Sequence, residues 1–144
     1  YIPAQPGKMV DIETGDIIGE HSGIMYYTIG QRKGLGIAYK HPLYVIGFNG
    51  DRNEVIVGPN ERLFTNRMIC KFYNFLDDTI HKELKAEGKI RYAANPSPCT
   101  ARILDDDTME VIFEEPQRAI TPGQSVAFYN GTQLLGGAVI DRVC

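Results

Sequence analysis

The residues most suited to binding chemistry lie in one glycine-rich loop, residues 26–37. Its three glycines allow the backbone to turn sharply and to approach a ligand without hindrance from a Cβ atom. Arg32 offers a planar fork of donors, Lys33 offers a mobile positive charge, and Gln31 can donate and accept hydrogen bonds in one plane. The glycine spacing matches neither a Walker A loop nor a Rossmann fingerprint. These residues alone therefore favour an anion-binding loop and a solvated tight turn equally.

The three cysteines predict a structural role rather than a catalytic one. No Cys-x-x-Cys pair occurs among Cys70, Cys99 and Cys144, and an odd number of cysteines does not make a disulfide framework. Cys70 and Cys99 lie in strand-like segments, so we expect small buried hydrophobic side chains. Cys144 ends the chain and is expected to be a frayed thiol.

No residues are spaced as metal ligands. His21, His41 and His81 are scattered, so solvated or hydrogen-bonded histidines are expected. The acidic triplet at residues 105–107 has no accompanying histidine and is most simply a turn. We therefore predict neither a metal site nor a catalytic residue in this chain.

Composition limits the kind of partner. The chain has 144 residues, a formal net charge of -3 and a pI near 5.6, so any contact with nucleic acid must come from local patches rather than from overall basicity. No apolar run approaches the ~18 residues of a membrane span, and no signal pattern opens the chain. These observations predict a soluble, cytoplasmic protein without a membrane partner.

Turn signals divide the first part of the chain into two β-hairpins. Strands are predicted at residues 8–11 and 16–20, and again at 43–48 and 54–58, where Asn, Gly and Asp residues form the intervening turn. Proline and polar residues then interrupt the pattern between residues 59 and 65. We predict a small β-rich module over residues 1–62.

Short strands also dominate the remainder of the chain. Segments 67–72 and 87–93 are predicted as strands around a polar, briefly helical connection at 77–85. Segments 99–104 and 109–113 follow, the latter with Met109, Val111 and Phe113 on one face and Glu110 and Glu114 on the other. Segments 125–129 and 134–140 flank Asn130-Gly131, a type I′ hairpin signal. The pattern predicts a mainly β protein whose residues 63–144 form an antiparallel, six-stranded type of barrel with very little helix.

The string YTIGQRKGLGI at residues 27–37 resembles the signature of the tRNA-specific 2-thiouridylases, the tRNA-uridine 2-sulfurtransferases. Further blocks follow the order of that family along the whole chain: YIPAQPG at 1–7, GEHSG at 19–23, VIVG at 55–58, KIRY at 89–92, the long block FEEPQRAITPGQSVAFY at 113–129, and LGG at 135–137. Several blocks at consistent separations make the resemblance far more specific than any one of them.

The resemblance implies that this chain is the central and C-terminal part of a longer enzyme, and its start at Tyr1 without an initiator methionine suggests a fragment. In that family ATP activates position 2 of the wobble uridine in tRNA, and a cysteine persulfide charged by a sulfur-donor protein delivers sulfur. The ATP-binding loop and the catalytic cysteines belong to an N-terminal part that is missing here. We therefore expect this fragment to bind no cofactor and to have no thiolation activity by itself.

The same resemblance implies a set of tRNA contacts. Arg91 and Tyr92 match the family's Arg-Tyr pair on a barrel strand, and Gln124 matches a second contact position. Gln31, Arg32 and Lys33 are expected to lie near tRNA or to brace the catalytic domain; the full set is Gln31, Arg32, Lys33, Arg91, Tyr92 and Gln124. From the residues alone, one member of the Arg-Tyr pair could be core and Gln124 could cap a turn.

Two departures from the family pattern bear on that set. Ala93-Ala94 replace a further Arg-Gln, and Asn74-Phe75 stand where relatives commonly carry Asn-Trp. Two other functions stay open: a stand-alone RNA- or protein-binding β-barrel without an enzymatic role, and a purely structural module that steadies a catalytic domain.

Overall fold

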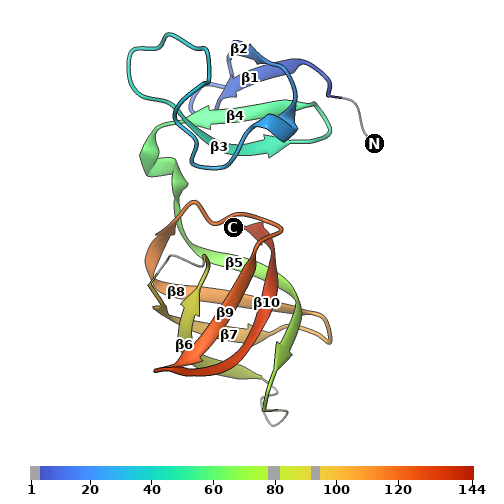
Figure 1. Ribbon diagram of the computed structural model, residues 1–144, viewed down its shortest axis with the longest axis vertical. Helices are drawn as coiled ribbons and strands as arrows, with labels where there is room; N and C mark the ends of the chain where they lie inside the picture. The colour runs from blue at the N-terminus through green and yellow to red at the C-terminus, as the bar shows by residue number, and fades with distance from the viewer. Residues whose placement is uncertain (1–3, 78–81, 92–94) are drawn as a thin grey trace. The chain divides into compact units, whose positions relative to one another are not determined.

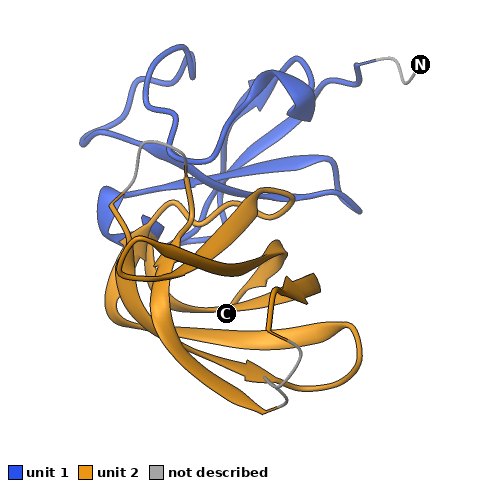
Figure 2. Ribbon diagram, turned by 60° about the horizontal axis from the view of Figure 1, so that its bottom comes forward, with its two compact units in different colours: residues 1–63 blue, residues 64–144 orange. Residues whose placement is uncertain are grey.

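The structure is a computed structural model that describes residues 4–77, 82–91 and 95–144. It divides into two compact units, Tyr1–Leu63 and Phe64–Cys144, each with its own hydrophobic core (Figure 2). Strands are the main regular structure of the described residues, with short 3₁₀ turns at η1 (Ile24–Tyr26) and η2 (Asn60–Leu63), and residues 22–43 form a long connection without a strand. The mainly β prediction is confirmed.

The first unit is built on a four-stranded sheet with the order β2-β1-β4-β3 (Figure 1). Both predicted hairpins are confirmed, since β1 pairs with β2 and β3 with β4 in antiparallel fashion. The two hairpins join through β1 and β4, which run parallel. The strands are β1 (Gly7–Asp11), β2 (Ile17–His21), β3 (Tyr44–Asn49) and β4 (Glu54–Gly58).

The core of this sheet also holds the glycine-rich loop in place. Met9, Val45 and Val55 are fully buried, and Leu35 and Leu43, which come from the long connection between β2 and β3, belong to the same cluster. Burial of two leucines from an irregular segment removes apolar surface from water and so fixes the segment against the sheet.

One end of β1 is tied to the turn between β3 and β4. The side-chain amide of Asn53 donates hydrogen bonds to the carbonyl oxygens of Gln5 and Pro6, at 3.0 and 3.1 Å. The buried His21 ring places Nε2 2.7 Å from the carbonyl oxygen of Asn53, and its edge meets the ring of Tyr27. His21 is therefore a hydrogen-bonded structural histidine, as the sequence predicts.

The second unit is a closed barrel of antiparallel strands in the order β10-β5-β8-β7-β6-β9 (Figure 1). Closure leaves no unpaired sheet edge. The predicted six-stranded barrel is confirmed. Its strands are β5 (Phe64–Phe75), β6 (Glu83–Lys89), β7 (Ser97–Ile103), β8 (Thr108–Arg118), β9 (Ser125–Asn130) and β10 (Gln133–Val143).

Both inner cysteines lie in the barrel core, as predicted. Cys70 is fully buried and Cys99 is 4% exposed. Burial raises the pKa of the Cys70 thiol to about 12 and that of Cys99 to about 11. Cys144 is exposed, but contrary to the prediction it is not frayed. Its amide donates to the carbonyl oxygen of Arg67, and its carbonyl oxygen accepts from the Thr65 hydroxyl.

Thiol titration of the folded chain should show this difference. At about pH 8 the two buried thiols stay protonated, and only a thiolate reacts with a disulfide reagent. We expect one fast equivalent, from Cys144, and three after denaturation, as read from the absorbance of Ellman's reagent. The Cys144→Ser variant should lose the fast equivalent. Fast reaction of a second thiol in the folded chain would contradict the buried position of Cys70 and Cys99.

The structure corrects the prediction for β6. The strand begins at Glu83, inside the expected polar connection, and it ends at Lys89 rather than at residue 93. Leu84 and Ala86 pack on the core, and the exposed Lys85 lies between them. The strand alternation of period two is therefore present, but the charged residues of this segment obscure it in the sequence. Residues 78–81 of that connection lie outside the described residues.

Two further details differ from the sequence prediction. Glu110 is only 5% exposed, because Arg67 and Arg102 form ion pairs with its two carboxylate oxygens and cover it.

In the last hairpin Asn130 pairs with Gln133, so the turn is Gly131-Thr132 with positive φ at Gly131 (61°). It is not the type I′ turn predicted at Asn130-Gly131.

Candidate functional site

The glycine-rich loop is folded by its own backbone and by Gln31. The amide of Gly30 donates to Val45 and the amide of Val45 donates to Gln31, at 2.8 and 2.9 Å. The Gln31 side chain accepts from the amide of Thr28 and donates to the carbonyl oxygen of Lys33, at 3.0 and 2.9 Å. Gln31 therefore braces the turn that presents the two cations beside it.

The two cations of this loop point into solvent. Arg32 and Lys33 are exposed, and in the described part of the chain neither side chain makes a hydrogen bond or an ion pair. Residues 21–50 contain no aspartate or glutamate, although the whole chain carries a net charge of -3. This segment is therefore a basic run in an acidic chain. A run without acidic residues is the sequence signal that could have extended the predicted site to Lys40 and His41.

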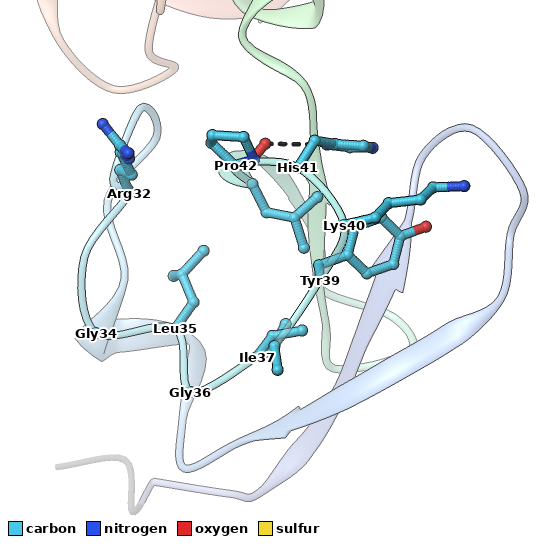
Figure 3. Close-up of a pocket in the computed structure, with 11 residues that line it drawn as sticks. Arg32, Gly34, Leu35, Gly36, Ile37, Tyr39, Lys40, His41 and Pro42 are labelled. Atoms are coloured by element: carbon cyan, nitrogen blue, oxygen red, sulfur yellow. Dashed lines mark hydrogen bonds between the residues drawn. The ribbon is translucent and has the colours of Figure 1, made fainter.

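Residues 32–43 enclose an open hollow of about 600 Å³ (Figure 3). Arg32 and Leu35 stand on one arm of the loop, Tyr39 to Pro42 on the other, and Ile37 near the end where the arms meet. The residues that line the hollow are Arg32, Gly34, Leu35, Gly36, Ile37, Ala38, Tyr39, Lys40, His41, Pro42 and Leu43. Sequence reasoning reached only Arg32 and the glycines among them.

The second arm is held to the sheet by a buried carboxylate. The hydroxyl of Tyr39 donates to Asp11 at 2.8 Å, and His41 meets the Tyr39 ring edge-on with centroids 4.9 Å apart. Hydrogen bonds from the amide of Glu13 and from Tyr39 hold the pKa of Asp11 below its usual value, and the same Tyr39 contact raises the pKa of the phenol. Asp11 therefore stays ionised and fixes Tyr39.

The other predicted contacts gather at one end of the barrel. Arg91 follows the end of β6, and its guanidinium donates to the carbonyl oxygen of Arg118 at the end of β8. Gln124 precedes β9, whose Ala127 pairs with Lys89 of β6. The expectation that Arg91 lies on a barrel strand is therefore wrong. Tyr92 lies outside the described residues.

Gln124 combines a bound backbone with a free side chain. Its amide donates to Thr121 at 3.2 Å, and its carbonyl oxygen accepts from Ile140 at 2.8 Å. The side chain is exposed, with no hydrogen bond among the described residues. Gln124 thus closes a turn through its backbone and leaves its amide group available to a ligand.

Comparisons with known proteins match both units. The family model described as "tRNA methyl transferase PRC-barrel domain" matches residues 1–59, and the one described as "Aminomethyltransferase beta-barrel domain" matches residues 65–140. The chain is 47% identical over 96% of its length to the tRNA-specific 2-thiouridylase MnmA of Clostridioides difficile (strain 630). The chain belongs to the tRNA-specific 2-thiouridylase family. The resemblance seen in the sequence motifs is confirmed.

Other members of the 2-thiouridylase family are equally similar. The chain is 48% identical over 95% of its length to MnmA 2 of Clostridium botulinum (strain Hall), and 45% identical over 96% to MnmA of Carboxydothermus hydrogenoformans. It spans only 38–39% of the length of these relatives, and in the first of them it corresponds to the C-terminal part.

Two kinds of feature are absent from the part of this chain that the structure describes. Within the described ranges, no three His, Cys, Asp or Glu residues are grouped so that they could hold a metal ion. Of the helices described, none has the length and apolar character needed to cross a bilayer.

Proposed function

We propose that this chain is the tRNA-binding, non-catalytic portion of a tRNA 2-thiouridylase. The observation that carries the proposal is the 47% identity, across both units, to proteins named for 2-thiolation of tRNA. In this proposal the whole protein is a cytoplasmic enzyme that thiolates position 2 of the wobble uridine. ATP and the sulfur-donor protein bind the part of the family's length that this chain does not span.

The described tRNA contacts of this proposal are exposed residues, apart from Gln31. Arg32 and Lys33 carry positive charge at the tip of a braced loop, and phosphate contacts of this kind position an RNA. Arg91 and Gln124 lie at one barrel end, where the Gln124 amide group can hydrogen-bond a base or a ribose. Gln31 contributes by holding the loop, and Tyr92 completes the set from the sequence.

The buried thiols support the non-catalytic part of the proposal. Sulfur transfer needs a thiolate, and the raised pKa of Cys70, about 12, and of Cys99, about 11, keeps both protonated at neutral pH. Neither of these two buried cysteines therefore offers the thiolate that sulfur transfer needs. The purified chain, given tRNA, ATP and sulfide, is expected to form no 2-thiouridine by mass spectrometry of digested tRNA. Formation of 2-thiouridine would refute this part.

Binding of unmodified tRNA over a range of salt concentrations tests the proposal directly. We expect salt-dependent binding, and Arg91→Ala and the Arg32→Ala/Lys33→Ala double variant should each weaken it. Each lost phosphate contact should make the slope of log affinity against log salt shallower by about 0.7 to 0.9. Gln124→Ala should cost about two- to tenfold in affinity without changing the slope, because a neutral hydrogen bond is worth about 0.5–1.5 kcal/mol.

The matched control is Lys82→Ala. Lys82 is an exposed cation just before β6, so it lies at the opposite end of that strand from Arg91. The proposal expects wild-type affinity for this variant. It fails if the wild-type chain binds no tRNA, or if Lys82→Ala weakens binding as much as Arg91→Ala. Absence of binding would leave the chain as a structural module of its parent enzyme, whereas equal losses would show that tRNA does not bind through the proposed contacts.

A further inference from the structure

The hollow enclosed by residues 32–43 has the features of a ligand site rather than of a gap in a loop. Its floor consists of side chains that belong to the core of the unit: Leu35 is 7% exposed and Leu43 is 6% exposed, with Ile37 packed against them. These side chains are fixed, so the apolar floor exists before any ligand arrives. We infer that this hollow accepts one unstacked nucleotide of an RNA strand, with its phosphate at Arg32 and its base on the apolar floor.

The size of the hollow fits that ligand. Its volume of about 600 Å³ lies within the ~300–1,000 Å³ of typical small-molecule sites and is larger than a phosphate ion needs. Gly34 and Gly36 carry no side chain on this wall, and their φ values of 77° and 68° favour glycine at both positions. A Cβ at Gly36 would meet no atom within 4 Å. The entrance on that arm is therefore open.

The charge around the hollow favours an anion. Arg32 and Lys40 line it, and among the described residues no aspartate or glutamate does. The nearby ionised Asp11 carboxylate accepts from the Tyr39 hydroxyl and the Glu13 amide and attracts Lys40 of the second arm. Figure 3 shows the side chains of Tyr39, Lys40 and His41 turned towards the outer side of their arm, which leaves Arg32 as the direct phosphate ligand and Lys40 as a source of positive field.

A nucleotide fits this combination better than an acidic peptide does. A nucleotide carries one phosphate beside a flat, weakly polar base, which matches one guanidinium beside an apolar floor. A run of peptide carboxylates would place charge against Leu35 and Leu43, at a desolvation cost that one guanidinium does not offset. The inference rests on the proposed function, because an RNA strand that reaches this loop supplies the nucleotide.

Amide chemical shifts of the ¹⁵N-labelled chain test the site with defined probes. Titration with uridine and adenosine 5′-monophosphates should shift the amide signals of residues 32–43, whereas uridine alone and inorganic phosphate should shift them at least about fivefold more weakly. Arg32→Ala should weaken the response about tenfold, as expected for a charged hydrogen bond. Arg52→Ala is the matched control, because it removes the same charge from an exposed arginine of the same unit that does not line the hollow. It should keep the wild-type response.

Ala38→Trp tests the volume of the hollow itself. Ala38 lines it and is exposed, so an indole can occupy the space without displacing a core side chain. This variant should abolish the nucleotide shifts while the signals of β1 to β4 stay in place. If those signals move, the comparison of Arg32→Ala with Arg52→Ala tests the site instead. The inference is overturned by absent nucleotide shifts, by an equal response to phosphate or to a glutamate-rich peptide, or by equal responses of the Arg32 and Arg52 variants.

The tRNA measurements separate this inference from the function it rests on. If wild-type chain binds tRNA and Ala38→Trp binds it equally well, with the same salt slope, the nucleotide site is wrong and the proposed function stands. If the mononucleotides bind as expected but tRNA does not, the site stands and the proposed function fails.

Discussion

Replacing Phe128 with alanine is expected to destabilise the barrel by about 3–5 kcal/mol, the usual cost of truncating a fully buried phenylalanine. Phe128 on β9 is 0% exposed, and its ring lies 5.9 Å from the ring of Phe75 across the interior. Alanine would leave a cavity that the closed barrel cannot fill, because every strand is hydrogen-bonded on both sides. Urea unfolding followed through the amide signals of residues 64–144 measures the change.

Phe72 provides a control of the same residue type. It lies on β5 of the same barrel, but its side chain is 67% exposed. Phe72→Ala removes the same atoms without opening a cavity, so its effect should stay within about 0.5 kcal/mol. Similar losses for Phe72→Ala and Phe128→Ala would show that the barrel interior is not packed as described.

Replacing Gly7 with alanine is expected to destabilise the four-stranded sheet by about 1–3 kcal/mol, the range for overpacking. A Cβ on Gly7 would overlap the carbonyl oxygen of Asn53 and lie 2.6 Å from Nε2 of His21. The nearest atom belongs to the backbone, so β1 or the β3–β4 turn must shift. That shift would break the His21 contact with Asn53, and the amide signals of residues 4–63 would report it during urea unfolding.

Gly47 on β3 is the matched control in the same sheet. A Cβ there would meet nothing within 4 Å, and its φ is not positive. Gly47→Ala should therefore change stability by no more than about 0.5 kcal/mol. If Gly47→Ala were as destabilising as Gly7→Ala, the loss would reflect backbone conformation in general and not the crowding around His21.

Strands and turns could be predicted in most cases because their signals are local. The hairpin at β3 and β4 follows from alternating apolar residues around Asn, Gly and Asp, and burial of Cys70 and Cys99 follows from the apolar residues beside them. The start of β6 was missed because its outward face is charged, and the position of the last turn was missed by one residue because pairing with β9 decided it.

The candidate site, too, was predicted only in part from the sequence. The sequence alone indicates the glycine-rich loop and its cations, because glycine conformation and side-chain charge are properties of single residues. It also carries the family motifs that place the chain among the 2-thiouridylases.

Only the tertiary structure decided which groups are free to act. Arg91 joined the end of β8, and Glu110 became buried between two arginines. These outcomes depend on partners distant in sequence, as does the hollow, whose leucine floor exists because Leu35 and Leu43 pack into the core of the sheet. Pairing and burial between distant segments are set by the folded chain, and no local pattern encodes them.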